Sequence, residues 1–239
     1  MIRKMVELVR KIIGTQRAIQ GIQTILNMQL FRSVIENSAW LKYRSFTPGG
    51  WAMDNAALYT LFRILNDVKP KRILEFGLGQ SSKMVHQYAA FSEDVTALTI
   101  EHDNNWIRFF CNEIPQNVNV TIKQFDTETV KFNGFETLSY KNINQFIGDE
   151  YDLIIVDGPF GSRHYSRSQI IDIVKNGLPE QFCIFMDDTE RDGEKETIGI
   201  LCKILQSMDV KYLIKDYNGE EKHHTIICSN NLKFLISLR

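Results

Sequence analysis

The sequence lacks several patterns that mark whole classes of protein. Its four cysteines, Cys111, Cys183, Cys202 and Cys228, form no C-x-x-C pair, which argues against a zinc knuckle or a dithiol redox motif. No run of about 18 apolar residues occurs, so nothing predicts a membrane span. The net charge of -1 lacks the basic excess that is typical of nucleic-acid binders. Neither a G-x-S-x-G nucleophile motif nor a Walker lysine is present.

An ordinary globular composition remains once those classes are set aside. Hydrophobic residues make up 44% of the chain and charged residues 24%, and 239 residues suffice for one α/β domain with a full core. The basic N-terminus has no apolar stretch of signal-peptide length, because Arg10 and Lys11 interrupt it. Widely spaced cysteines without a signal peptide lead us to expect a cytoplasmic protein with buried thiols.

Residues 2–36 repeat apolar side chains at helical spacing, although Gly14 and Gly21 weaken the pattern. We expect an appended helix that packs on the domain or on a partner subunit. Packing on a second copy of the chain would form a homodimer. The alternative is a helix that touches a membrane surface, because five basic residues outnumber the single Glu7 in this region. The apolar positions are Met5, Leu8, Val9, Ile12, Ile13, Ile19, Ile22, Ile25 and Leu26.

Short apolar runs alternate with helical patterns from residue 70 to the C-terminus. Such alternation predicts an α/β fold with a doubly wound, mostly parallel sheet that helices cover on both faces. The Asn218-Gly219 turn joins the last two strands as an antiparallel hairpin, so that seven strands are expected in all. The other strands are expected at 72–77, 94–103, 118–126, 151–159 and 181–188, and the helices between them at 81–91, 104–114, 166–177 and 196–208.

Two further segments complete this division of the chain. Residues 1–68 are expected to be an N-terminal helical extension and cap, and residues 69–239 to be one ligand-binding domain. Residues 127–150 fit no regular pattern, apart from one short helix expected around residues 139–146.

The most informative stretch is ILEFGLGQSS, residues 73–82, where the first strand turns into a helix. Gly77 and Gly79 lack a Cβ atom, so the backbone can turn tightly and approach a ligand. A dinucleotide fingerprint needs a third glycine at the place of Ser82. Glu75 would repel a pyrophosphate and attract an ammonium group. The turn therefore favours a cationic ligand without phosphate, such as S-adenosylmethionine (SAM).

The acid, the two glycines and a second acid resemble motif I of class I, Rossmann-like SAM-dependent methyltransferases. The resemblance covers roughly residues 70–239. Glu101 stands about 20 residues past the glycines, where an acid can bind ribose hydroxyls, and His102 could flank the adenine. The resemblance implies that Asp126 contacts the adenine amino group, although a loop acid is the alternative. The expected SAM-binding residues are Glu75, Gly77, Gly79, Ser81, Glu101, His102, Asp126 and Asp157.

Three carboxylates stand near the ends of the fourth and fifth expected strands: Asp157 in VDGP, and Asp187 and Asp188 in MDDTER. At neighbouring strand ends they would repel one another unless a cation such as Mg²⁺ lay between them. This resembles catechol-type O-methyltransferases, in which such acids hold a metal that orients a hydroxyl. Phe160 departs from that family, because it stands at the place of the lysine base. Without a metal, Asp157 would contact SAM and the other two acids would cap the next helix.

The loops after Asp157 and Asp188 also resemble those of methyltransferases that act on sugars and polysaccharides. His164 could be a general base for a hydroxyl, since its unperturbed pKa lies near neutrality. The candidate catalytic residues are therefore Asp157, His164 and Asp188. Three arginines in the same loops could hold an acidic substrate or could pair with the nearby acids. They are Arg163, Arg167 and Arg191.

The function that these patterns predict is SAM-dependent O-methylation of a carbohydrate or small metabolite, with a divalent metal as a possible second cofactor. Two other classes stay open, namely an NAD(P)-binding oxidoreductase and a non-catalytic partner protein with the same fold. Glu75 and Ser82 argue against the first class, and the intact glycine turn with Glu101 argues against the second. No N/D-P-P-Y run follows the fourth strand, so no nucleic-acid substrate is expected.

Overall fold

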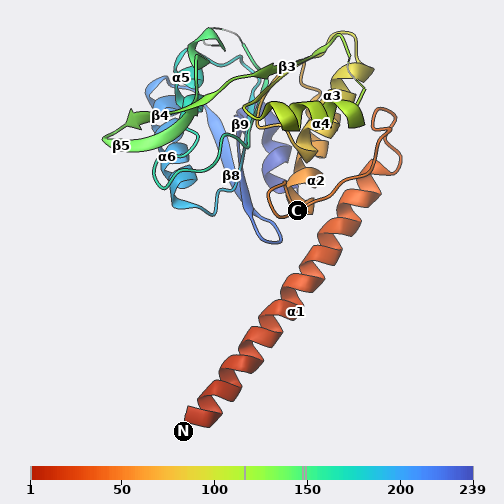
Figure 1. Cartoon of the computed structure of the whole chain (residues 1–239), viewed down its shortest axis with the longest axis vertical. Coiled ribbons are helices and arrows are strands. Elements are labelled where there is room, and N and C mark those ends of the chain that lie inside the picture. The colour runs from red at the N-terminus through yellow and green to blue at the C-terminus, as the bar shows by residue number, and fades with distance from the viewer. Residues whose placement is uncertain (1, 116, 147, 149, 239) are drawn as a thin grey trace.

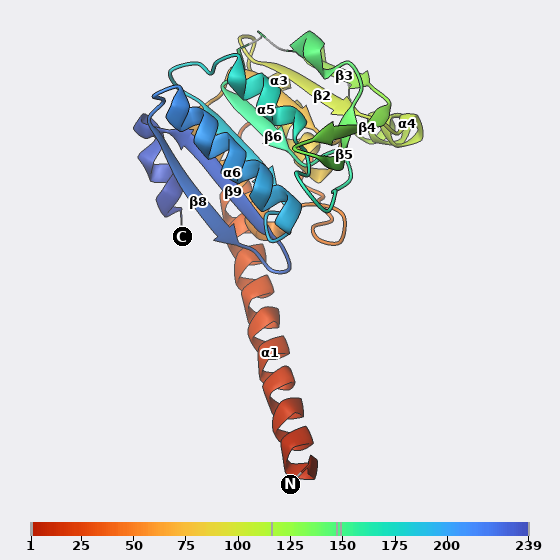
Figure 2. The ribbon, with the colours of Figure 1, turned by 90° about the vertical axis from the view of Figure 1, so that its left-hand side faces the viewer.

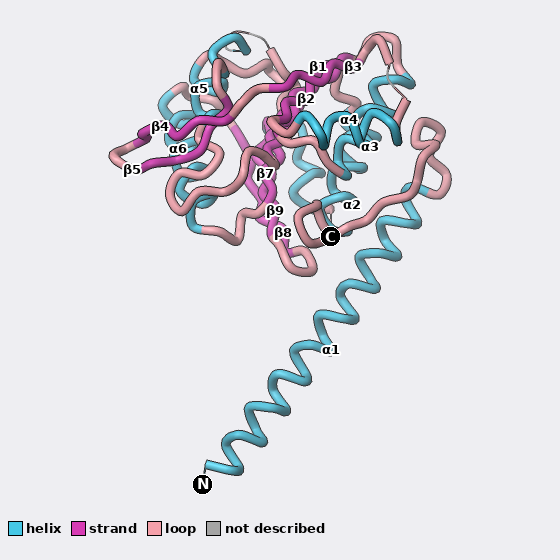
Figure 3. Tube along the Cα trace, in the orientation of Figure 1, coloured by secondary structure: helices cyan, strands magenta, loops and turns pink. Residues whose placement is uncertain are grey.

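A computed structural model describes residues 2–115, 117–146, 148 and 150–238, and within them seven strands build one sheet with helices on both faces (Figures 1 and 3). The helices are α1 (Ile2–Ile35), α2 (Asn55–Arg63), α3 (Gln80–Phe91), α4 (Asn104–Glu113), α5 (Gln169–Lys175) and α6 (Asp192–Ser207), with the helical turns η1 (Ile64–Val68), η2 (Ile143–Phe146) and η3 (Asn230–Ser237). The strands are β1 (Arg72–Phe76), β2 (Thr96–Glu101), β3 (Val120–Gln124), β4 (Thr127–Phe132), β5 (Phe135–Tyr140), β6 (Leu153–Val156), β7 (Cys183–Asp187), β8 (Tyr212–Asn218) and β9 (His223–Ser229).

The strand order of the large sheet is β3-β2-β1-β6-β7-β9-β8. The first five strands in this order pair in parallel, whereas β9 runs antiparallel to both β7 and β8. This confirms the predicted seven-stranded α/β sheet with its antiparallel C-terminal hairpin. The central strands β6 and β7 are buried along their whole length, which explains why they appear in the sequence as continuous apolar runs.

Alternate residues of the central strands point into two hydrophobic cores. Ile73 and Ile155 face a layer formed by α2, α3, η3 and the C-terminal end of α1. Leu74 and Ile154 face a layer formed by α5 and α6, which lies in front of the sheet in Figure 2. Because helices cover both faces, a ligand can reach the sheet at the carboxyl ends of its parallel strands, where open α/β sheets bind their ligands.

Helix α1 projects far from the domain, with the N-terminus at its distant end (Figure 1). Only its C-terminal part packs on the domain, where Phe31 and Ile35 are buried in the α2 and α3 layer. Residues 10–26 are exposed, apart from the partly buried Gln23. The helix confirms the periodic pattern, and neither Gly14 nor Gly21 interrupts it. Among the described helices, none combines the length and the apolarity needed to cross a membrane.

Residues 127–140 form a β-hairpin that the sequence pattern did not reveal. Strands β4 and β5 pair antiparallel around Asn133-Gly134, whose φ angles of 47° and 85° suit a tight hairpin turn. The short helix expected at residues 139–146 is wrong in its first half, because Ser139 and Tyr140 end β5 and only η2 is helical. No residue of β4 is buried and β5 is exposed at its start, so the two strands show only a weak apolar alternation.

Candidate functional site

The loops that follow β1 and β6 meet where the strand order reverses. From β1 the chain moves outward to β2 and β3, and then returns to β6 on the other side. Gly77 has a φ angle of 94°, and a Cβ atom there would lie 3.0 Å from the backbone nitrogen of Gly158. A Cβ atom on Gly158 would lie 2.9 Å from the Cα of Gly77. Both positions therefore need glycine, and this crossing is the point at which open parallel sheets bind ligands.

Glu75 lies beneath the glycine turn. Its side chain is fully buried, Oε1 accepts a hydrogen bond from Ser81 Oγ at 2.7 Å, and Oε2 accepts one from Thr99 Oγ1 at 2.9 Å. Burial raises the pKa of Glu75 to about 7, although hydrogen bonds from Ser81 and Thr99 oppose the rise. Glu75 and Ser81 were both expected to contact SAM, but neither residue lines the cavity described below. They instead hold the turn in place.

Glu101 and His102 line the cavity at the end of β2. Glu101 Oε2 accepts a hydrogen bond from the Leu78 amide at 3.0 Å, and Oε1 accepts one from the His102 amide at 2.6 Å. These bonds fix the carboxylate and leave Oε2 a second lone pair for a ligand hydroxyl. Trp106 also lines the cavity and is 37% exposed, and its indole N–H donates to the Leu78 carbonyl at 2.6 Å.

The cavity between these loops has a volume of about 420 Å³. Sites for small ligands and cofactors span about 300–1,000 Å³. Trp51 and Phe160 stand on its solvent side, 84% and 56% exposed, with their ring centroids 5.8 Å apart. The expected cofactor-binding and catalytic residues that line it are Gly77, Gly79, Glu101, His102, Asp157 and Asp188.

Asp126 and Arg163, which the sequence suggested for the site, do not line this cavity, and neither does Asp54 of the cap. The side chain of Asp126 is 69% exposed and lies 3.8 Å from Lys141 Nζ, so it occupies the surface beyond β3. Asp54 is the N-cap of α2, where its Oδ1 accepts a hydrogen bond from the Ala57 amide at 2.9 Å. Arg163 is exposed in the loop after β6.

His164 also lies outside the cavity, in a surface cluster with the β4–β5 hairpin. Its Nδ1 is 3.0 Å from Glu196 Oε1, and its ring centroid is 4.2 Å from that of Phe135. The hairpin is fastened to the same loop, because Thr137 Oγ1 donates to the Tyr165 carbonyl at 3.0 Å. The position of His164 therefore lends no support to a role as general base.

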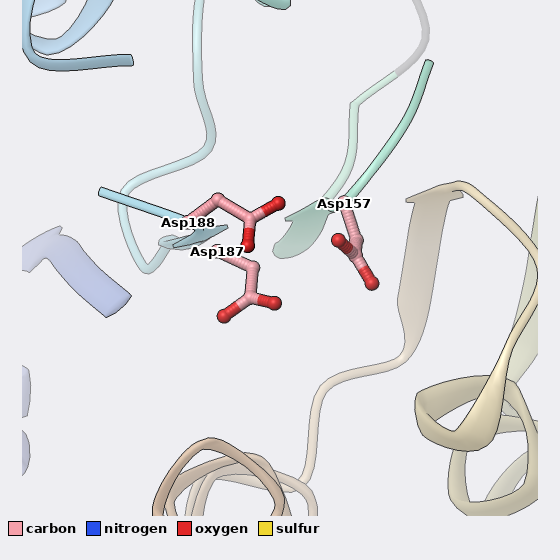
Figure 4. A group of neighbouring side chains, drawn as sticks. All are labelled: Asp157, Asp187 and Asp188. Atoms are coloured by element: carbon pink, nitrogen blue, oxygen red, sulfur yellow. The ribbon is translucent and has the colours of Figure 1, made fainter. Parts of the chain in front are cut away.

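Asp157, Asp187 and Asp188 come together at the ends of β6 and β7 (Figure 4). One carboxylate oxygen of each lies within 4.8 Å of the others, in the arrangement that the sequence predicted. Asp187 is fully buried and Asp188 is 3% exposed. Helix α6 begins at Asp192 with Arg191 as its N-cap, so neither Asp187 nor Asp188 caps it.

Cations of the chain surround these acids. Arg167 donates to Asp188 Oδ2 at 2.6 Å, and Arg191 Nη1 is 3.1 Å from the same oxygen. Lys222 comes from the turn between β8 and β9, and its Nζ is 3.0 Å from Asp188 Oδ1 and 3.8 Å from Asp187 Oδ2. Both carboxylate oxygens of Asp188 therefore have a cationic partner.

Arg167 ties the two strand ends together. It is 2% exposed, donates to the Asp187 carbonyl at 2.8 Å, and lies 3.5 Å from Asp157 Oδ1. Arg167 and Asp188 each have a φ angle of 59°, a left-handed conformation that is uncommon for residues other than glycine. Two such residues in one ion pair are typical of a functional site, where the surrounding structure holds the strained backbone in place.

Burial and mutual repulsion set the protonation of the acids. Burial raises the pKa of Asp157 to about 6, against the opposing field of Arg167. Burial and the neighbouring acids raise the pKa of Asp187 well above its ordinary value. Burial also acts on Asp188, but Arg167 and Lys222 outweigh it and lower its pKa. The cluster therefore has one firmly ionised carboxylate, Asp188, and two acids that hold protons more readily.

A divalent metal would need carboxylate oxygens that no other cation occupies. Asp188 offers none, because Arg167, Arg191 and Lys222 engage both of its oxygens. Asp187 is the best remaining donor, since neither of its oxygens accepts a hydrogen bond from the described residues. Beside an ammonium and a guanidinium, the remaining carboxylate oxygens of Asp157 and Asp187 make a poor metal site. The donor set fits a cluster that the chain neutralises itself.

Two residues of the site were missed in the sequence. Tyr140 is 2% exposed and lines the cavity, and its hydroxyl has no hydrogen-bond partner in the described part of the chain. A Cβ atom on Gly158 would lie 2.5 Å from that hydroxyl. Lys222 was missed as the partner of Asp188. Tyr140 ends a strand that was not predicted and Lys222 lies in a polar turn, so neither residue had a motif around it.

Comparison with known proteins relates this fold to methyltransferases. The sequence matches no protein-family model and no curated protein. An O-methyltransferase from Bacillus cereus, solved with S-adenosylhomocysteine (SAH), is 12% identical and aligns over 87% of this chain and 91% of that chain with a TM-score of 0.52. An SAH-bound methyltransferase from Podospora anserina is 15% identical over 84% of this chain and 86% of that chain, with a TM-score of 0.48. The chain therefore has the fold of class I, SAM-dependent O-methyltransferases.

Proposed function

We propose that this chain transfers the methyl group of SAM to a hydroxyl group of a carbohydrate or small metabolite. The observation that carries the proposal is the contact of Gly77 with Gly158 at the reversal of strand order, beside the fixed carboxylate of Glu101. The sheet argues against NAD(P) as the ligand, because the dinucleotide-binding sheet is parallel with the order 3-2-1-4-5-6. Here the antiparallel strand β9 lies between β7 and β8.

The cavity residues suit SAM. When bound, SAM supplies a methyl group that its sulfonium has already activated, so the protein has mainly to orient the acceptor and take up a proton. Gly77 and Gly79 would let the backbone approach the cofactor, and Glu101 would accept hydrogen bonds from its ribose hydroxyls. His102 and Trp106 would flank the adenine. Residues 69–239 are thus the proposed SAM-binding domain, and the preceding cap adds Trp51 to the cavity.

Asp157 is the proposed general base. Its carboxylate lines the cavity, and burial raises its pKa to about 6, close to the pH at which a base must work. It would accept the proton of the acceptor hydroxyl as the oxygen takes the methyl group. Arg167 and Asp188 would position Asp157 through the ion pairs that join β6 to β7.

Metal-independent transfer follows from the cations around the acids. In the proposed site Arg167, Arg191 and Lys222 neutralise the three carboxylates, which is the task of a divalent ion in the catechol-type enzymes. A second reading, in which a metal displaces Lys222 from Asp187, is favoured by the two Asp187 oxygens that lack hydrogen-bond partners. Chelation separates the two readings.

The solvent side of the cavity favours a carbohydrate acceptor. Trp51 and Phe160 expose large aromatic faces there, and an exposed apolar patch beside a cavity is typical of a binding site. Aromatic faces can stack on the C–H groups of a sugar ring. Arg191 lines the same cavity with its side chain 41% exposed, so it could also bind an acidic group such as a uronate carboxylate.

The test is transfer of labelled methyl from SAM to a panel of neutral and acidic sugars, polysaccharides and small hydroxylated metabolites. We expect label in an ether linkage, unchanged by EDTA, and a loss of about 10²- to 10⁴-fold in kcat for Asp157→Asn with little change in SAH affinity. Asp172→Asn, at an acid whose side chain is half-exposed on α5, is the matched control. Loss of activity in EDTA that Mg²⁺ restores would establish the metal reading. SAH binding without transfer to any acceptor would favour a non-catalytic partner protein.

A further inference from the structure

The exposed part of α1 carries a narrow apolar seam. Ile12, Thr15, Ile19, Ile22 and Leu26 follow one another at alternating intervals of three and four residues, which is the a and d spacing of a coiled coil. The four apolar members are 50%, 57%, 59% and 57% exposed. In the sequence the same spacing continues toward the N-terminus. An unpaired stripe of this kind would leave large aliphatic side chains in water along several turns.

The polar residues and the glycine in this part of α1 are placed so that they leave the seam free to pack. The Thr15 hydroxyl donates to the Lys11 carbonyl at 3.0 Å, so the polar group is satisfied within the helix and the methyl group is free to pack. Arg10 and Arg17 are seven residues apart and take the f position, on the side of the helix opposite the seam. Gly14, which weakens helix formation, also falls outside the a and d positions.

The domain does not cover the seam. Where α1 reaches the domain, Asn27, Phe31 and Ile35 are the residues that become buried. These positions follow a row that is distinct from the row of Ile19, Ile22 and Leu26, and Leu26 itself remains 57% exposed beside the buried Asn27. The helix therefore offers one face to its own domain and another face to solvent.

We propose that the seam pairs with the same seam of a second copy of the chain, as a parallel two-stranded coiled coil. A seam of a and d residues fits another helix with the same repeat. A helix that lies on a membrane presents a broader apolar face, and among the exposed large apolar residues at positions 10–35 Ile13 alone lies outside the a, d, e and g positions.

Parallel pairing in register also explains the residues that flank the seam. It brings each g residue beside the e residue five positions further along the partner. Ile25 would then meet Leu30 of the other copy, and these two side chains are 53% and 43% exposed in the single chain. Lys11 would meet Gln16, so no pair of like charges opposes association.

Sedimentation equilibrium of the full chain tests the proposal. The wild-type protein is expected to be a dimer at micromolar concentration, and Ile19→Glu with Ile22→Glu is expected to weaken dimerisation by at least 100-fold. Gln20→Glu introduces the same type of charge at an exposed position outside the seam and should leave the dimer intact. Because Ile19 and Ile22 are 57% and 59% exposed and take no part in the core of the domain, the melting temperature of the domain should not change.

Disulfide crosslinking tests the orientation. Ile12→Cys is expected to crosslink two chains under mild oxidation, because equal residues face each other in a parallel dimer, whereas Arg10→Cys should not. A wild-type monomer would overturn the proposal. A double variant that remains dimeric would also overturn it, as would a monomeric chain that binds vesicles of phosphatidylserine through α1. A wild-type dimer that does not crosslink at position 12 would overturn the parallel arrangement of the two helices.

Discussion

Substitution of Glu75 by glutamine should change the free energy of unfolding in a pH-dependent way. The value for the variant minus that for the wild type should be larger at alkaline pH than at acidic pH. The folded state raises the pKa of Glu75 from 4.5 to about 7 because the carboxyl is buried. The folded protein therefore binds this proton more tightly than the unfolded chain, and the contribution of Glu75 to wild-type stability falls as the pH rises from 4.5 through 7. A shift of about 2.5 pKa units corresponds to about 3 kcal/mol. Glutamine keeps the shape of the side chain and removes this dependence.

Urea denaturation of both proteins at about pH 4 and about pH 8 measures the effect. The quantity to compare is the free energy of unfolding of Glu75→Gln minus that of the wild type. We expect this difference to grow by about 3 kcal/mol from the acidic to the alkaline condition. Differencing removes most contributions of other groups, such as His86, whose pKa burial lowers to about 3.

Glu180→Gln is the control, because Glu180 is exposed in the loop before β7 and should change stability by no more than about 0.5 kcal/mol. A difference for Glu75→Gln that is the same at both pH values would refute the reasoning. It would mean that the carboxyl is solvated, or that Ser81 and Thr99 stabilise its ionised form as well as water does.

Three further substitutions test the site. Arg167→Met should lower the free energy of unfolding by about 3–5 kcal/mol in urea denaturation, because it leaves Asp188 buried without its closest cation. Adding Asp188→Asn to this variant should restore part of the loss. Gly158→Ala should destabilise the fold by about 1–3 kcal/mol and abolish SAH binding in calorimetry, since its Cβ atom would press on the Gly77 backbone. The Cβ atom of Gly79→Ala would meet open space, so this variant should have the melting temperature of the wild type. Trp51→Ala should raise the KM for the acceptor about tenfold at unchanged SAH affinity, and an unchanged KM would remove Trp51 from the acceptor site.

Much of the fold could be predicted because burial leaves a direct trace in the sequence. The strands that are covered on both faces, such as β6 and β7, appear as uninterrupted apolar runs. The Asn218-Gly219 turn fixed the closing hairpin, which the structure places as β8 and β9. The β4–β5 hairpin escaped because it lies outside the large sheet and much of it is exposed, so its alternation is weak despite the Asn133-Gly134 turn.

The candidate site could be predicted only where a motif marks the backbone. Gly77 could be recognised because the strand-to-helix turn needs its positive φ angle, and Asp157, Asp187 and Asp188 because they end neighbouring strands. Contacts between distant side chains leave no such trace. Nothing in the sequence indicates that Lys222, 34 residues past Asp188, would engage that acid. The place of Glu75 beneath the turn likewise depends on hydroxyl groups from two other elements.

The central claim is that the cavity at the reversal of strand order binds SAM. Isothermal titration calorimetry of the full chain with SAH, and separately with NAD⁺, tests this claim most directly. We predict one SAH bound per chain, no heat of binding with NAD⁺, and loss of SAH binding in Gly158→Ala. Binding of NAD⁺ in the absence of SAH binding, or SAH binding that Gly158→Ala leaves unchanged, would contradict the account.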